Sequence, residues 1–168
     1  METDRSARSP ERNKFSPADS LSIATLCLDA ESASQLRSFL DSTPLAQLAA
    51  ELQHYLADEH DSVFIDRLRD LHPDICIIDF DRDRERAGST AEKIHETLGG
   101  TAIFAVSSES QPDLIIGAMR CGCSEYLIKP IGRDALLEAL ARVGGKRKDK
   151  REQAAGKVLA FLAAKGGT

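Results

Sequence analysis

The feature that most constrains this chain is a set of short apolar runs, each closed by a polar residue. ICIID, residues 75–79, is apolar up to its final aspartate. Three other runs have the same form: SIATLCL at 22–28, TAIFAVSS at 101–108 and EYLIKP at 125–130. Apolar runs without alternating polar residues predict strands buried on both faces, as in a parallel sheet covered by helices.

Segments with helical periodicity or helix boundary signals lie between these runs. They are residues 31–41, 63–71, 89–98, a helix capped by Ser110 and opened by Pro112, and 134–143 ended by Gly144. Residues 44–58 are ambiguous, because they have helical character where a second strand is needed. Alternating strands and helices predict an α/β, flavodoxin-like fold, with a five-stranded parallel sheet and helices on both faces.

Four polar side chains are predicted to meet at one edge of this sheet. Asp29, Asp79, Ser107 and Lys129 each stand at or just after the end of a predicted strand, and ligand sites in such folds lie at the carboxyl ends of the strands. Singly, each has a plain explanation as a helix cap or a solvated side chain. Together they would suit a phosphoryl-accepting site: a carboxylate nucleophile, a hydroxyl and an ammonium for the phosphoryl oxygens, and acids for Mg²⁺.

Two segments carry a family resemblance. PDICIID, 73–79, resembles the segment that ends at the phospho-accepting aspartate of two-component receiver domains, the CheY-like family, and CGCSEYLIKPI, 121–131, resembles their last strand. The resemblance covers about residues 20–143. It implies a role for each of these residues: Asp79 as phosphoacceptor position, Asp29, Ser107 and Lys129 as receiver site, Tyr126 as switch aromatic, and Pro130 after a cis peptide bond.

The chain departs from the receiver pattern in two places. Receivers usually carry two adjacent acids after the first strand, but LCLDAES has Asp29 alone, with Glu31 two residues later. Asp29 and Asp79 are therefore weak Mg²⁺ candidates, and we expect poor phosphorylation, because Mg²⁺ requires near-octahedral oxygen ligands. The run FDRDRERAG, 80–88, replaces a loop usually rich in Met, Pro and Gly, and its alternating charges predict a solvated loop.

Composition excludes several classes of protein. The formal charge of −5 gives no bulk affinity for nucleic acid, and no apolar run approaches the roughly 20 residues of a membrane helix. Residues 1–19 contain no signal peptide, so we expect a disordered lead and a cytoplasmic protein. Four scattered histidines and the C-x-C at Cys121 and Cys123 do not make a zinc site, so buried or idle thiols are expected.

The end of the chain suggests a second unit. Residues 144–156, which begin GGKRKDKREQ, predict a basic linker. Residues 157–168, KVLAFLAAKGGT, predict a strand over 158–163 that runs into a glycine loop. This segment resembles the opening of MinD/ParA-like ATPases, whose deviant phosphate loop reads K-G-G-x-G-K-T/S. Lys165, Gly166, Gly167 and Thr168 match its start, but the final G-K-T/S is absent, so we expect neither ATP binding nor enzyme activity from this chain.

A receiver followed by a MinD-like ATPase is the order found in TadZ/CpaE proteins of tight-adherence (Tad) pilus assembly. This resemblance implies a regulatory or interaction domain of a pilus localisation ATPase. Its implied partners are the pilus or secretion machinery at a cell pole or the inner membrane face, and a homodimer is a further expectation. The alternative is a working response-regulator receiver that accepts phosphate at Asp79 from a histidine kinase.

Overall fold

The computed structural model describes residues 19–165, with side chains up to residue 156. Five strands form one sheet in the order β2-β1-β3-β4-β5, and every neighbouring pair is parallel. The strands are β1 (Leu21–Leu26), β2 (Ala46–Leu52), β3 (Ile75–Asp79), β4 (Ala102–Ser107) and β5 (Glu125–Ile128). The predicted flavodoxin-like α/β fold with a five-stranded parallel sheet is confirmed.

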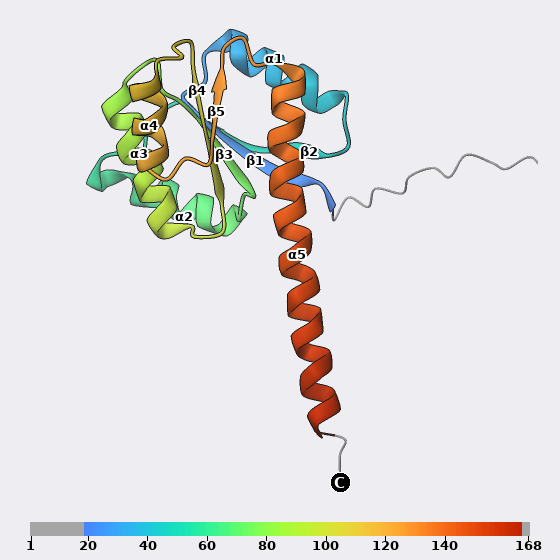
Figure 1. The fold of residues 1–168 in the computed structure, drawn as a ribbon. Coiled ribbons are helices and arrows are strands. Elements are labelled where there is room, and N and C mark those ends of the chain that lie inside the picture. The colour runs from blue at the N-terminus through green and yellow to red at the C-terminus, as the bar shows by residue number, and fades with distance from the viewer. Residues whose placement is uncertain (1–18, 166–168) are drawn as a thin grey trace, which may run out of the picture.

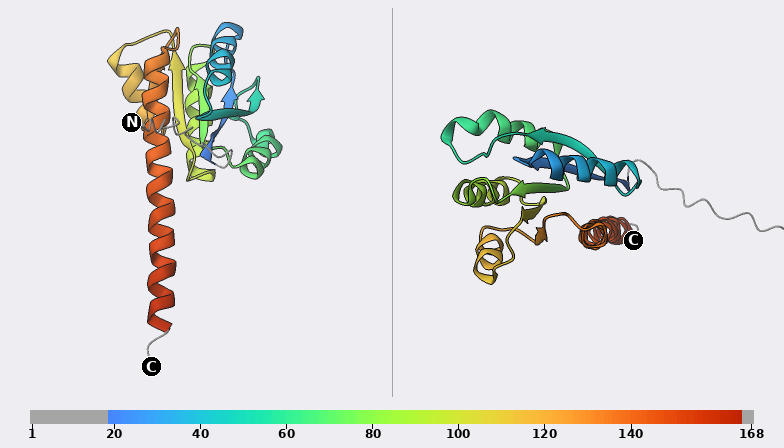
Figure 2. Two further views of the ribbon diagram at one scale, coloured as in Figure 1. Left: turned by 90° about the vertical axis from the view of Figure 1, so that its right-hand side faces the viewer. Right: turned by 90° about the horizontal axis from the view of Figure 1, so that it is seen from above.

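Helices cover both faces of the sheet (Figures 1 and 2). They are α1 (Ala30–Asp41), α2 (Ser62–Leu71) after the short 3-10 helix η2 (Glu59–Asp61), α3 (Arg84–Thr97), α4 (Pro112–Arg120) and α5 (Arg133–Lys165). One core lies between the sheet and α2, α3 and α4, and a second lies between the sheet and α1 and α5. Among the described helices, none is both long and apolar enough to cross a membrane.

Strand β3 shows why the continuous apolar runs become central strands. Ile75 and Ile77 face the core under α1 and α5, while Cys76 and Ile78 face the core under α2, α3 and α4. All four are 0% exposed. Burial of a large aliphatic side chain contributes roughly 1.5–3 kcal/mol, so both faces of this strand favour the sheet.

The ambiguous segment contains strand β2, at the edge of the sheet. Its residues are alternately more and less buried, and its backbone pairs in parallel with β1, with Leu21 opposite Ala46. The local sequence AQLAAEL is rich in good helix formers. Pairing with β1 therefore decides its conformation, and local propensity does not.

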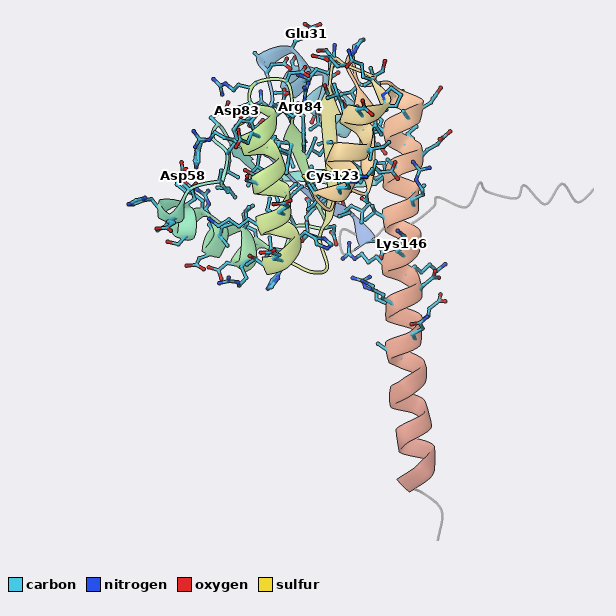
Figure 3. All side chains as sticks on the ribbon, turned by 60° about the vertical axis from the view of Figure 1, so that its left-hand side comes forward. Glu31, Asp58, Asp83, Arg84, Cys123 and Lys146 are labelled. Atoms are coloured by element: carbon cyan, nitrogen blue, oxygen red, sulfur yellow. The ribbon has the colours of Figure 1, made fainter. Side chains whose placement is uncertain are left out.

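The charged run at 80–88 was predicted to be a solvated loop, but only residues 80–83 form a loop. The prediction is wrong for residues 84–88, which belong to α3. Helix α3 begins at Arg84, five residues earlier than predicted. The side chain of Asp83 accepts a hydrogen bond from the Arg86 N–H at 3.0 Å and caps the helix (Figure 3). Further along the chain, α4 begins at Pro112 as predicted, but its N-cap residue is Gln111 and not Ser110.

Helix α5 corrects the prediction of a helix end at Gly144 and a linker at 144–156. The helix continues to Lys165 and projects well beyond the sheet (Figure 1). A glycine inside a helix costs only about 1 kcal/mol, and the next ten residues, KRKDKREQAA, are mostly strong helix formers. Arg147 also binds Asp74 Oδ2 and the Ser20 carbonyl, both at 3.2 Å, which fastens the helix to the sheet after the glycines.

The predicted strand at 158–163 is also wrong, because these residues belong to α5. A strand leaves its backbone groups unpaired unless a second strand lies beside it, whereas a helix pairs them within one segment. Ala and Leu make up four of these six residues and are good helix formers. Gly166, Gly167 and Thr168 lie outside the described residues, as does the predicted disordered lead up to residue 18.

Candidate functional site

The structure brings all four residues predicted for the sheet edge together. Asp79 is the last residue of β3, Ser107 is the last of β4, and Lys129 follows β5. The ammonium of Lys129 lies 2.6 Å from Asp79 Oδ2 and 2.7 Å from Asp29 Oδ2. The peptide bond between Lys129 and Pro130 is cis, as the receiver resemblance implied.

Asp29 has two roles in the structure. It is the N-cap of α1, where it accepts hydrogen bonds from the Ser32 N–H and the Ser32 hydroxyl, both at 2.8 Å. It also forms the ion pair with Lys129. No second acid joins it from this part of the chain: Leu28 is 5% exposed and packs in the core, and Glu31 projects outward from the start of α1 (Figure 3).

Asp81 belongs to the site although the sequence did not single it out. Its Oδ2 lies 3.0 Å from the Lys129 ammonium, and its Oδ1 accepts a hydrogen bond of 2.6 Å from the Ser107 hydroxyl. The Ser108 N–H donates to both of its oxygens, at 3.0 and 2.9 Å. The backbone N–H of Asp81 donates to Asp79 Oδ1 at 2.9 Å, so the two aspartates are fixed relative to one another.

Ser107 connects this cluster to Tyr126. Its side chain is 0% exposed, and its hydroxyl oxygen accepts a hydrogen bond from the Glu109 N–H at 3.1 Å. The Tyr126 hydroxyl donates to the Glu109 carbonyl at 2.8 Å. The predicted switch aromatic is therefore linked to the site through the loop that follows β4.

Tyr55 is a second residue that sequence reasoning missed. It lies in the segment after β2, is 5% exposed, and donates a hydrogen bond of 2.6 Å to the Asp79 carbonyl. Its hydroxyl oxygen accepts from the Asp83 N–H at 3.3 Å. Burial raises the pKa of Tyr55 to about 12, so the phenol stays protonated. Tyr55 thus connects the end of β3 to the start of α3.

Electrostatic interactions keep Asp29, Asp81 and Lys129 ionised. Burial opposes the charge on Asp29, Asp81 and Lys129, but the ion pairs and hydrogen bonds outweigh it. They hold the pKa values of Asp29 and Asp81 below the usual range and raise the pKa of Lys129. One ammonium contacts three carboxylates, and Arg82 lines the adjoining pocket.

These residues do not fit a magnesium ion as they are arranged. Mg²⁺ would need the carboxylates of Asp29 and Asp79 as ligands, but the Lys129 ammonium lies between them and binds an oxygen of each. Within the described part of the chain, no group of three or more His, Cys, Asp or Glu side chains is placed to hold a metal ion.

A pocket of about 410 Å³ opens beside the cluster. It is lined by Cys27, Leu28, Asp29, Ala30, Gln53, Asp79, Asp81, Arg82 and Lys129. Burial raises the pKa of the Cys27 thiol, although Arg82 opposes this change. Cys27, Cys76 and Cys123 are buried free thiols and Cys121 is half-buried, which confirms the expectation of buried, unpaired cysteines.

The residues predicted for an incomplete phosphate loop lie far along the chain from this site. Lys165 is the last residue of α5, and its side chain is not among those described. Gly166, Gly167 and Thr168 lie outside the described residues.

Comparison with known proteins relates the chain to receiver domains through its structure. No family model matches it, and no curated protein matches its sequence. A candidate pilus assembly-related protein from Burkholderia pseudomallei has 21% identity and a TM-score of 0.64, over 76% of this chain and 91% of that one. A candidate pilus assembly protein (cpaE) from Burkholderia thailandensis has 21% identity and a TM-score of 0.62, over 74% and 98%.

A third solved structure comes from two-component signalling. It is the signal receiver domain of the candidate response regulator NarL from Mycobacterium tuberculosis, with 12% identity, a TM-score of 0.62, and coverage of 75% of this chain and 97% of that one. At these identities the likeness concerns the fold alone. The chain has the flavodoxin-like receiver fold of response regulators.

Proposed function

We propose that the receiver-like domain, about residues 20–143, is a regulatory module that acts through protein contacts and is poorly phosphorylated at Asp79. The ion cluster around Lys129 carries this proposal. Its ammonium already binds Asp79, Asp29 and Asp81, at 2.6, 2.7 and 3.0 Å. An incoming phosphoryl group would need this ammonium for its own oxygens.

The state of the Asp79 carboxylate supports the same proposal. One oxygen is bound by Lys129 and the other accepts from the Asp81 N–H, and the side chain is 3% exposed. A nucleophile that is buried and bonded through both oxygens reacts slowly with an external donor.

Acetyl phosphate with Mg²⁺ in the buffer tests this proposal. Transfer would form a bond between an Asp79 oxygen and phosphorus, break the bond from phosphorus to the acetyl oxygen, and release acetate. We expect the intact mass to show little phosphoryl addition. Asp79→Asn is the control, because any labelling that persists in this variant occurs at another residue.

The second candidate function is a response-regulator receiver that accepts phosphate at Asp79 from a histidine kinase. The meeting of Asp79, Ser107 and Lys129 at one edge favours it, because these groups can supply the nucleophile and two donors for phosphoryl oxygens. Near-stoichiometric addition of one phosphoryl group, lost in Asp79→Asn, would establish this second function and overturn the first.

For the biological setting we propose a cytoplasmic, TadZ/CpaE-type protein of Tad pilus assembly. The pilus-assembly names of two structural neighbours support this setting, as does the K-G-G-T match at the end of the sequence. The proposed partners are the pilus or secretion machinery, with recruitment to a pole or the inner membrane face, and a homodimer is part of the same proposal. The MinD/ParA-like ATPase domain would follow this segment in the parent protein, and this chain by itself is not an enzyme.

Localisation and nucleotide binding test this setting separately. A fluorescent fusion of the chain in a cell with Tad pilus genes should form a polar focus that disappears when those genes are deleted. A uniform distribution in both cells would contradict recruitment by the pilus machinery. Calorimetric titration of the chain with Mg-ATP should give no binding, because the G-K-T/S part of the phosphate loop is absent.

A further inference from the structure

The carboxylate of Asp81 is surrounded by donors of three kinds. The Ser107 hydroxyl donates at 2.6 Å, the Ser108 backbone N–H donates at 3.0 and 2.9 Å, and the Lys129 ammonium lies at 3.0 Å. A hydroxyl, a backbone N–H and an ammonium that converge on one anion form an oxyanion site. Here the anion is part of the chain itself.

This donor set is also the one that a phosphoryl group on Asp79 would use. Its hydroxyl and ammonium are the two groups expected to hold phosphoryl oxygens, and the Ser108 N–H adds a third donor. Asp81 stands two residues after Asp79, and its own N–H donates to Asp79 Oδ1, so its carboxylate lies directly beside the acceptor. The Asp81 carboxylate therefore fills the place that a phosphoryl group on Asp79 would take.

We propose that the Asp81 carboxylate is an internal ligand of the oxyanion site formed by Ser107, Ser108 and Lys129. It holds the loop after β4 in its anion-bound arrangement without phosphorylation of Asp79. This inference rests on the proposed function insofar as it takes this edge of the sheet as a phosphoryl site. The oxyanion site is then permanently occupied, and the Asp81 carboxylate is its occupant.

Asp81 is the one acid of the charged run that reaches this site. Asp83 caps α3 through the Arg86 N–H, and Glu85 lies exposed in the first turn of α3. The backbone around Asp81 is fixed on the other side as well, because the Phe80 N–H donates to the Val106 carbonyl at 2.8 Å. The turn after β3 therefore presents this particular carboxylate to Ser107.

The contact extends from the site to the surface of the domain. Ser107 donates to Asp81 and accepts from the Glu109 N–H, while the Glu109 carbonyl accepts from the Tyr126 hydroxyl. The Glu109 carboxylate lies 3.5 Å from Arg84 at the start of α3. Removing the Asp81 carboxylate frees the Ser107 hydroxyl to rotate, which loosens the Glu109 and Tyr126 contacts.

Replacement of the missing carboxylate by formate tests the inference. In ¹⁵N-labelled Asp81→Ala, the Ser108 amide proton should move upfield, and the Glu109 amide and Tyr126 ring signals should shift with it. Added formate, a free carboxylate, should return these signals toward their wild-type positions. It should leave the wild type unchanged, because Asp81 already fills the site. Equal concentrations of chloride control for ionic strength.

Two further variants make the result specific. Asp81→Ala combined with Ser107→Ala should lose the response to formate, because the hydroxyl donor is gone. Glu85→Gln removes a charge from the same run without touching the site, and it should reproduce the wild-type spectrum. Should Asp81→Ala fail to fold, Asp81→Asn is measured in the same way. Its neutral amide should shift the Ser108 signal, because it donates to and accepts from the site differently.

Unchanged Ser108 and Tyr126 signals in Asp81→Ala or Asp81→Asn would overturn the inference, and so would an equal response of the wild type to formate. The formate experiment involves no phosphoryl transfer. Phosphorylation of the wild type by acetyl phosphate would therefore contradict the proposed function, whereas failure of formate to restore the signals would contradict the role of Asp81.

Discussion

The ammonium of Lys129 lies 2.6 Å from Oδ2 of Asp79, and the Asp79 side chain is 3% exposed. A carboxylate this deeply buried is stable only while a cation and hydrogen-bond donors compensate its lost hydration. Asp79 and Lys129 therefore form a structural pair in this protein. Removal of either partner changes the stability of the whole domain.

Lys129→Met should lower the free energy of unfolding by about 3–5 kcal/mol, because it keeps the apolar stem but leaves Asp79 buried without its cation. Urea denaturation followed by circular dichroism measures the change. In the Asp79→Asn background the same substitution should have a clearly smaller effect. Lys148→Met, at an exposed position of α5, should change stability by no more than about 0.5 kcal/mol. Equal losses in the two backgrounds would show that the pair is not coupled.

Tyr55→Phe should destabilise the domain by about 1–3 kcal/mol, because it leaves the Asp79 carbonyl without its buried donor. Tyr126→Phe is the matched control: its hydroxyl also donates to a carbonyl, that of Glu109, but at an exposed position. Its effect on the free energy of unfolding should be smaller. The reverse order of the two losses would contradict the structural role of Tyr55.

Stability should fall in acid as pH drops through and below 3.8, the ordinary pKa of the Asp29 and Asp81 carboxyls. Both pKa values are lowered in the folded protein, so the unfolded chain binds more protons in this range and stability rises with pH. The contribution is complete above that ordinary value and is lost as pH approaches the lower folded values. Urea midpoints between about pH 2 and pH 5 measure the slope. The slope should be shallower in Asp29→Asn and in Asp81→Asn, and an unchanged slope in both would refute this origin.

Gly144→Ala and Gly145→Ala should each stabilise α5 by about 0.5–1 kcal/mol. A β-carbon at either position meets no atom within 4 Å, and alanine has the higher helix propensity. Far-ultraviolet circular dichroism should show equal or greater helix content, together with higher urea midpoints. Gly122→Ala should act in the opposite direction, because Gly122 has a φ of +98° and a β-carbon there would lie 2.8 Å from His95 Cγ. Loss of helix in the α5 variants would favour a flexible linker after residue 143.

The central strands and the convergence of the site followed from the sequence alone. Apolar runs such as ICIID can bury both faces only inside a covered parallel sheet. Once the strands are parallel, their carboxyl ends share one edge, and the flavodoxin-like strand order makes β3, β4 and β5 neighbours, so Asp79, Ser107 and Lys129 come near one another. The direction and the order of the strands are enough for this prediction, without knowledge of individual contacts.

Only the tertiary structure decided the roles of Asp81 and Tyr55 and the conformations of β2 and α5. Asp81 looked like any acid of a solvated run, since its donors Ser107, Ser108 and Lys129 lie more than twenty residues away in the sequence. Strand β2 has the composition of a helix and exists because β1 lies beside it. The segment at 158–163 is a continuous apolar run of the kind that predicts a buried strand, yet it belongs to α5, because a helix pairs its backbone groups within one segment. Local patterns predict what a segment can bury, but the partner available for its backbone determines the structure that it forms.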